Sequence, residues 1–317
     1  MKKHLLVLAL IAIHRKFQTR RVAEDSTRLY GEATQHSMRL SADGYILAAP
    51  LAHAYERIIS ASDNISEIVA LLGDADKLVA VDSSSLLPKD VMEKKPKVGY
   101  RRVLSGEGIL SYTPDLVILP PDAGPAEIIK HLEGAGVSLL RIKDGRGEQG
   151  VADDIRTIAK ALGREQEGEA LIARLTATMD EARAAQQTYP ARPRILVLYD
   201  GLSDQLSSMG PKSGGDALVQ LLGGDNAVDV AGMKLLSPEA LLTLPADAIL
   251  IARLDRHFDD NASYADPAEY PDLAQSQAGK RGCLIQINVM ESLGFGPSYA
   301  DAVRDISKTL ASCLNKP

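Results

Sequence analysis

The stretch that decides the fold is residues 164–187, REQEGEALIARLTATMDEARAAQQ. Its Leu171, Leu175 and Met179 recur every four residues, which places them on one face of a helix. At about 1.5 Å per residue, a continuous helix of this length would run roughly 35 Å, the width of a domain. A flexible linker would instead be rich in Gly and Ser, so we predict a stiff connector between two bodies.

The sequences on both sides of this helix alternate continuous apolar runs with helical segments. Such runs are typical of parallel strands whose two faces are covered by helices. The predicted fold class is therefore α/β, with two Rossmann-like lobes whose central, mostly parallel sheets are joined by a single long rigid α-helix. Strands are expected at residues 57–60, 77–81, 115–119, 137–142, 194–198, 248–251 and 284–288. Helices are expected at residues 66–72, 107–111, 126–135, 216–222 and 299–314, with a further helix from about 153 to Gly163.

The two halves share a gapless echo, in which residues 104–119 align with residues 236–251. Leu, Ser, Glu, Leu and Asp recur at matching positions, and Glu107 and Glu239 are equivalent. The period is far too long for a solenoid, so the echo indicates two similar lobes. The expected boundaries are an export segment at 1–54, a first lobe at 55–150, connecting helices at 151–190 and a second lobe at 191–317.

The composition is that of a globular protein of about two domains, with 317 residues, 45% of them hydrophobic and 25% charged. A net charge of −6 excludes nucleic-acid binding by the chain as a whole and leaves only a local basic patch open. Two cysteines are too few for a zinc ribbon or an iron–sulfur cluster. Cys283 and Cys313 are either a disulfide in an oxidising compartment or two buried thiols.

The N-terminus has two of the three parts of a secretory signal, namely a basic start and an apolar run at residues 5–13. This run is too short to span a membrane. The third part comes late, because Ala52-His53-Ala54 is the first good cleavage site and residues 14–45 form an atypical insertion. We expect a mature chain from near Tyr55, exported to the periplasm, soluble and not lipid-anchored. A cytosolic protein with a ragged N-terminus is the alternative.

Several segments resemble one family, and the resemblance covers about residues 56–314. The chain resembles the substrate-binding proteins of bacterial ABC importers that have two α/β lobes joined by a rigid helix (class III). Within that class it is similar to the periplasmic haem-binding proteins, and Gly99-Tyr100-x-Arg102 and residues 293–297 are the most specific segments. The resemblance also takes in residues 57–69, 98–108, 223–227 and 236–241.

The resemblance implies a transport function rather than an enzyme. Such a protein captures haem b in the cleft between its lobes and delivers it to an ABC transporter permease with a cytoplasmic ATPase. It implies an outer-membrane haem receptor system upstream, and it implies neither a free metal ion nor a nucleic-acid partner.

The resemblance assigns Tyr100 as the axial ligand of the haem iron and Arg102 as its support. Tyrosinate is a hard anionic oxygen donor and a known ligand of haem iron. Arg102 lies two residues on, which places it on the same side as Tyr100 if the segment is extended. Arg101 is either a partner of a haem propionate or a solvated side chain, and Lys212 is a second candidate for a propionate. An interface tyrosine beside two surface arginines is the alternative interpretation.

The second lobe is expected to form the other wall of the cleft. Tyr199, Met209 and Arg253 are the candidates, because they follow or lie near predicted strands at the edge where such sites form. Arg256 and His257 are further rim candidates, and residues 208–213 are expected to form a small-residue loop. Some relatives carry a histidine near Tyr199 as a second iron ligand, and this sequence has none there.

Two acidic residues are candidates for docking to the permease. The family uses one acidic residue on each lobe, which here corresponds to Glu107 and Glu239, and Glu67 is a weaker candidate. A glutamate that complements a helix dipole is the alternative, and both roles can hold together.

Three other functions are weighed. A cobalamin or siderophore protein of the same fold would use tryptophan walls or several arginines, and the chain has no Trp. A zinc or manganese protein would need several histidines, and only His131 and His257 remain after cleavage at residue 54. A periplasmic enzyme or chelatase-like protein would need a catalytic motif, and the sequence contains no Gly-x-Ser-x-Gly elbow or P-loop.

Overall fold

The computed structural model describes residues 38–40, 46–48, 55–201, 206–254 and 262–316. The chain divides into two compact units, residues 1–53 and 54–317. In the first unit, strands β1 (Met38–Leu40) and β2 (Ile46–Ala48) pair antiparallel. The predicted cleavage site and most of the export segment lie outside the described residues. Within the described part of the chain, no helix is long and apolar enough to cross a membrane.

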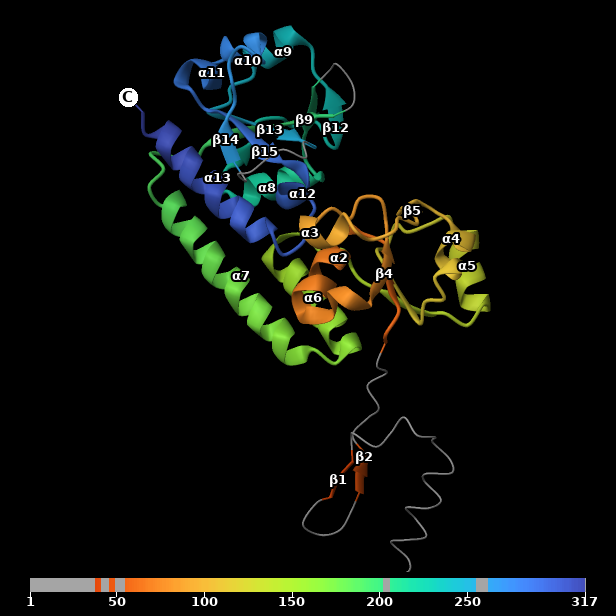
Figure 1. Ribbon diagram of the computed structural model, residues 1–317. Helices are drawn as coiled ribbons and strands as arrows, with labels where there is room; N and C mark the ends of the chain where they lie inside the picture. The colour runs from red at the N-terminus through yellow and green to blue at the C-terminus, as the bar shows by residue number, and fades with distance from the viewer. Residues whose placement is uncertain (1–37, 41–45, 49–54, 202–205, 255–261, 317) are drawn as a thin grey trace, which may run out of the picture. The chain divides into compact units, whose positions relative to one another are not determined.

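The second unit begins with a four-stranded sheet in the order β4-β3-β7-β8, in which all neighbouring strands are parallel. We call residues 55–146 lobe 1 (orange to yellow in Figure 1). The central strands β3 and β7 are completely buried, as their runs of consecutive apolar residues predict. The strands are β3 (Ile58–Ser60), β4 (Leu78–Val81), β7 (Leu116–Leu119) and β8 (Ser138–Arg141).

Residues 191–316, which we call lobe 2, contain a seven-stranded mixed sheet. Its path is β12-β10-β9-β13-β15-β14, and β11 also pairs with β9. The central strands β9, β13 and β15 are parallel, whereas β10, β12 and β14 are antiparallel additions at the two edges. The strands are β9 (Arg194–Asp200), β10 (Ser207–Met209), β11 (Asp225–Asn226), β12 (Met233–Leu235), β13 (Ala248–Arg253), β14 (Ala262–Tyr264) and β15 (Leu284–Asn288).

Helices cover these sheets, and most begin or end within a few residues of the predicted positions. The largest difference in lobe 1 is α2, which begins at Asp63 rather than Ser66 and continues into a wide turn at Ala70–Asp74. The helices of lobe 1 are α2 (Asp63–Val69), α3 (Lys89–Met92), α4 (Gly106–Ser111) and α5 (Ala126–Gly134). Those of lobe 2 are α8 (Gly214–Leu221), α9 (Pro238–Thr243), α10 (Pro271–Ala274), α11 (Gln277–Arg281), α12 (Val289–Leu293) and α13 (Tyr299–Leu314).

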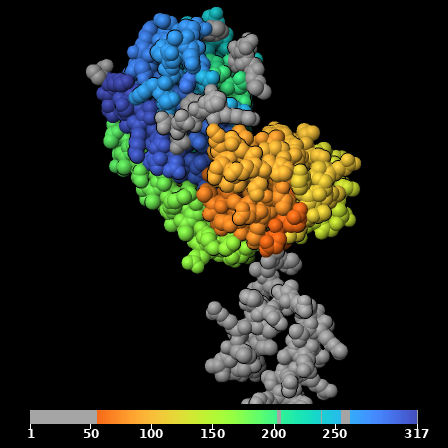
Figure 2. All heavy atoms as spheres, in the orientation of Figure 1, coloured from red at the N-terminus to blue at the C-terminus, as the bar shows by residue number. Residues whose placement is uncertain are grey.

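Two helices connect the lobes: α6 (Gly147–Leu162) and α7 (Glu165–Gln186). Gly163 adopts a left-handed conformation (φ 67°) that ends α6. The predicted continuous helix is confirmed by α7, whose stripe of Leu171, Leu175 and Met179 is buried. Helix α7 packs against α6 and against α13, and the green and blue ribbons of Figure 1 and the spheres of Figure 2 show it lying along α13.

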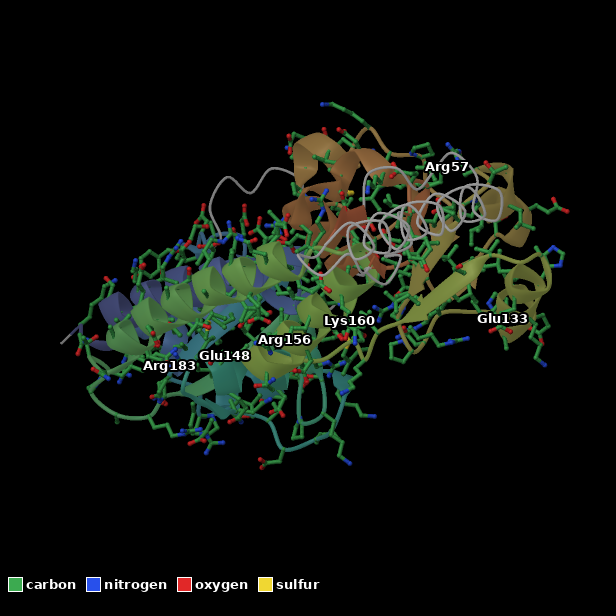
Figure 3. All side chains as sticks on the ribbon, turned by 90° about the horizontal axis from the view of Figure 1, so that it is seen from below. Arg57, Glu133, Glu148, Arg156, Lys160 and Arg183 are labelled. Carbon is green, nitrogen blue, oxygen red and sulfur yellow. A yellow bond between two sulfur atoms is a disulfide. The ribbon has the colours of Figure 1, made fainter. Side chains whose placement is uncertain are left out.

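Ion pairs fasten α6 to α7 on their exposed side. Arg183 near the end of α7 pairs with Glu148 in the first turn of α6, and Arg156 pairs with Glu169 at 2.7 Å. Figure 3 labels Arg183 and Glu148 side by side along the two helices. These contacts hold the connector as a packed helical pair rather than a free linker.

Cys283 and Cys313 form a disulfide bond, which resolves the two alternatives left by the sequence. The bond joins the residue before β15 to the last turn of α13, 30 positions along the chain. It therefore ties the closing helix of lobe 2 to the sheet beneath it.

The expectation of a loop at residues 208–213 is wrong for its first two residues, because Ser207–Met209 form strand β10. Only residues 210–213 form the turn that leads into α8. Strand β10 pairs with β9 and β12, so its Ser-rich sequence is stabilised by backbone hydrogen bonds at the sheet edge.

Candidate ligand-binding site

Tyr100 lies on a short antiparallel hairpin formed by β5 (Gly99–Tyr100) and β6 (Val103–Leu104). Gly99 has φ of 99°, and a Cβ there would lie 2.7 Å from the carbonyl oxygen of Val103, so the hairpin requires glycine at this position. The side chains of Tyr100 and Val103 are 42% and 69% exposed. The hairpin thus presents an aromatic and an aliphatic side chain to solvent.

The two arginines occupy the turn of this hairpin, so residues 100–102 are not extended, and extended geometry does not place Arg102 on the side of Tyr100. Both arginines converge on Asp122: Arg102 Nε donates to its Oδ2 at 2.8 Å and Arg101 Nη2 lies 3.1 Å from the same atom. The hydrogen bond to Asp122, followed by the charge interactions with Tyr100 and Asp122, raises the pKa of Arg102. Arg102 is therefore a fixed cation within electrostatic reach of Tyr100.

Arg101 is not a solvated side chain. It is half-buried, its Nη1 lies 3.4 Å from Ser62 Oγ, and it lies 3.9 Å from Asp144 Oδ2. These contacts anchor the hairpin to the start of α2.

A cavity of about 290 Å³ lies between the two lobes. Its apolar lining comes from Leu86, Leu87 and Met92 of lobe 1 and from Leu254 and Met290 of lobe 2. None of these five lining residues is among those predicted from the sequence. A signal was available, since Leu254 and Met290 follow β13 and β15 at the carboxyl ends of parallel strands. The polar residues of the cavity are Lys89, Glu93, Lys97, Asn288 and Glu291.

The predicted residues of lobe 2 are less available to a ligand than expected. Met209 is only 8% exposed and belongs to the hydrophobic core, and Tyr199 packs against the same core. Arg253, at the end of β13, lies 3.2 Å from Glu269 and 3.6 Å from Asp200. These three residues do not line the cavity between the lobes.

Arg253 instead lines a second cavity of about 640 Å³, within lobe 2, together with Asp200, Glu269 and Tyr270. Burial, followed by the hydrogen bond to Asp200, raises the pKa of Tyr270 to about 12, so its hydroxyl stays protonated. Arg256 and His257 lie outside the described residues.

Lys212 is exposed in the turn before α8, with φ of 68°, and its carbonyl oxygen accepts a hydrogen bond from Arg146 at 3.4 Å. This contact joins the turn to the residue that precedes α6. Lobe 2 also exposes Val230, Met233 and Leu235 on or beside the edge strand β12, an apolar group that the sequence analysis missed.

Glu107 and Glu239 occupy matching positions on two short helices, one in each lobe. In α4 the hydroxyl of Ser105 accepts the backbone N–H of Gly108 at 3.0 Å, and in α9 that of Ser237 accepts the N–H of Ala240 at 3.2 Å. Both glutamates are exposed in the first turn. The hydrogen bond from its own backbone N–H, followed by one from Ser237, lowers the pKa of Glu239.

Glu67 is not available as a docking residue, so that candidate is wrong. Its side chain is 4% exposed and accepts hydrogen bonds from Ser298 in lobe 2. Helix α2 is not a surface helix, because all seven of its residues are buried. Within the described residues, no group of three or more His, Cys, Asp or Glu side chains could hold a metal ion.

Comparison with known proteins places this geometry in a family. The solved periplasmic haem-binding protein RhuT from Roseiflexus sp. RS-1, in apo form, is 32% identical with a TM-score of 0.72, over 82% of this chain and 99% of that one. The ABC transporter substrate-binding lipoprotein YvrC of Bacillus subtilis is 27% identical over 199 residues, 62% of this chain and 63% of YvrC.

A vitamin B12-binding protein of Vibrio campbellii is 26% identical over 171 residues, 54% of this chain and 60% of that protein. The alignments with YvrC and with this protein thus span less than two thirds of either relative. The family model described as "Periplasmic binding protein" matches residues 58–287. Because this match takes in both lobes and well over half of the chain, the protein belongs to the periplasmic binding protein family.

Proposed function

We propose that this protein captures haem b between its two lobes in the periplasm and delivers it to the permease of an ABC importer. The observation that carries the proposal is the exposed Tyr100 beside the fixed Arg102, on a fold that matches a haem-binding protein over 99% of that protein's length. The similar proteins include both a periplasmic haem-binding protein and a lipoprotein, so the absence of a lipid anchor is the finer part of the proposal.

Tyr100 is proposed as the axial ligand of the haem iron. Ferric iron is a hard cation and binds the phenolate form of tyrosine, whose free phenol ionises only near pH ~10. Iron binding favours the anion, and the cationic Arg102 is proposed to pair with the iron-bound phenolate. Asp122 holds Arg102 in place, which keeps this cation near the phenolate.

The remaining contacts are assigned by charge and accessibility. Lys212 is proposed to meet a haem propionate, because it is exposed in the turn before α8. Arg101 is a weaker candidate for the same role, since it already pairs with Asp122 and Asp144. Leu254 and Met290 are proposed as the lobe 2 wall.

Delivery is proposed to use Glu107 and Glu239 as docking residues for basic side chains of the permease. The support is their matching placement, one on each lobe, both exposed in the first turn of a serine-capped helix.

The test is a hemin titration of the purified full chain, followed by visible absorption. Wild type is expected to give ferric high-spin bands, and Tyr100→Phe is expected to lose them because it lacks the oxygen ligand. Tyr264→Phe is the matched control, since Tyr264 is 47% exposed on β14, and its spectrum should stay that of wild type. Wild type without a spectral change, or Tyr100→Phe with unchanged bands, would contradict the proposal.

Cobalamin is the second candidate ligand, and its support is the alignment with the vitamin B12-binding protein of Vibrio campbellii. A parallel titration with cyanocobalamin separates the two candidates. Binding of cyanocobalamin that is insensitive to Tyr100→Phe, without binding of hemin, would replace haem by cobalamin.

A further inference from the structure

Helix α2 carries two carboxyl groups into the contact between the lobes. Asp63 and Glu67 are 3% and 4% exposed, and their spacing of four residues places them on one face of the helix. Glu67 Oε1 accepts the backbone N–H of Ser298 at 2.6 Å, and Oε2 accepts its hydroxyl at 3.1 Å. Ser298 immediately precedes α13 of lobe 2, so Glu67 links the two lobes directly.

Asp63 lies one turn earlier on α2, and within the described residues only one of its two carboxyl oxygens accepts hydrogen bonds. Its Oδ1 accepts the backbone N–H groups of Leu86 at 2.8 Å and Leu87 at 3.3 Å, two residues that line the cavity between the lobes. Its Oδ2 is buried and has no hydrogen-bond partner within the described residues. A buried carboxylate oxygen without a partner is costly, and a proton on this carboxyl would reduce the cost.

Lobe 2 approaches these carboxyl groups through two glycines of the segment 293–297. A Cβ on Gly296 would lie 2.1 Å from Glu67 Oε2, and one on Gly294 would lie 3.3 Å from Asp63 Oδ2. The close approach at Gly296 therefore requires glycine. This packing gives a physical reason for the Leu-Gly-Phe-Gly-Pro segment, because its glycines let the backbone of lobe 2 cover two acids of lobe 1.

The charges around the pair are mostly negative. Asp82 and Glu291 disfavour ionisation of Asp63 and Glu67 respectively, and Lys97 favours ionisation of Asp63. Burial is the largest effect on both, and it raises the pKa of Asp63 to about 7 and that of Glu67 to about 8. The charge of Asp63 is the second effect that raises the pKa of Glu67.

We propose that Asp63, Glu67 and Ser298 form a proton-dependent clasp between the lobes, which holds them together while the carboxyl groups keep a proton and loosens when both ionise. Two negative charges on one buried helix face repel each other, and separation of the lobes lets water reach them. Since the pKa values of the folded protein lie above the ordinary values of 3.8 and 4.5, the stabilisation is complete below those values. It is lost as pH rises through about 7 and 8.

The direct test follows the backbone amide signal of Ser298 by NMR in the labelled full chain as a function of pH. The expected midpoint is near 8, because this N–H reports the charge of Glu67. Asp63→Asn should move the midpoint down, since it removes a neighbouring negative charge. A midpoint near 4.5, or no effect of Asp63→Asn, would overturn the clasp.

A second measurement uses thermal unfolding without any ligand, so its outcome is independent of haem binding. The melting temperature of wild type should fall as pH rises from about 6 to about 9, and Glu67→Gln should flatten that dependence. Glu127→Gln, in the exposed first turn of α5, is the matched control and should keep the wild-type slope. A wild-type slope in Glu67→Gln would contradict the proposal, and if that variant does not fold, the Ser298 titration decides.

Discussion

Lobes 1 and 2 share a plan of parallel strands and serine-capped helices but complete it by different means. Lobe 1 has four parallel strands and buries several polar side chains, among them Asp63, Asn64, Ser66 and Glu67 of α2. Lobe 2 extends its parallel centre with antiparallel edge strands and closes its last helix with a disulfide. Lobe 1 therefore depends on charge and hydrogen bonding, whereas lobe 2 depends on a covalent link.

The largest expected effect on stability comes from removing the disulfide bond of lobe 2. Replacing Cys283 and Cys313 together by Ala should lower the free energy of unfolding by about 3–4 kcal/mol, because the bond closes a loop of 30 positions. Urea unfolding of the oxidised and the reduced wild type provides the comparison, and reduction should reproduce the loss. Equal stability of the oxidised and reduced protein would contradict the expectation.

In lobe 1, the interaction that corresponds to this disulfide bond is an ion pair. Arg164, the residue before α7, donates from Nη2 to Oδ1 of Asp74 at 2.8 Å, and the Asp74 side chain is 1% exposed. Arg164→Ala should cost about 2 kcal/mol, because it strips a buried carboxylate of its main partner while Lys77 stays 3.5 Å away. The same urea measurement on Arg174→Ala, an exposed arginine of α7, serves as the control and should show a clearly smaller change.

The smallest expected effect on stability concerns the serine-capped helices that both lobes contain. Ser105→Ala and Ser237→Ala each remove a helix cap, so each should lower the free energy of unfolding by about 1 kcal/mol. Equal losses would support the equivalence of α4 and α9. A loss confined to one variant would show that the echoed sequences differ in their energetics.

The sequence predicted the parts of the fold that show a regular pattern of apolar residues. The buried stripe of α7 shows a helical period, and the continuous apolar runs of β7, β9, β13 and β15 are long enough to indicate buried strands. Strands β10, β12 and β14 have three residues each, which is too short for a period, and their pairing depends on neighbours far away in the chain. The sequence predicts too late a start for helix α2, because Asp63 and Asn64 are residues typical of loops. In the structure, both residues are buried against the other lobe.

The candidate site could likewise be predicted only in part. The segment Gly99-Tyr100-x-Arg102 identified an exposed tyrosine with a nearby cation. The turn that places Arg101 and Arg102 against Asp122 could not be predicted, since Asp122 lies 20 residues away. The burial of Glu67 also depends on a partner, Ser298, that is 231 positions distant.

Helix α7 has a consequence for how the two lobes unfold. Because it packs against α6 and against α13, its Leu171, Leu175 and Met179 lose their cover when either neighbour leaves. Unfolding of one lobe would therefore expose apolar surface that the other lobe also relies on, and this shared cost couples the two. We therefore expect lobes 1 and 2 to melt in a single transition rather than in two.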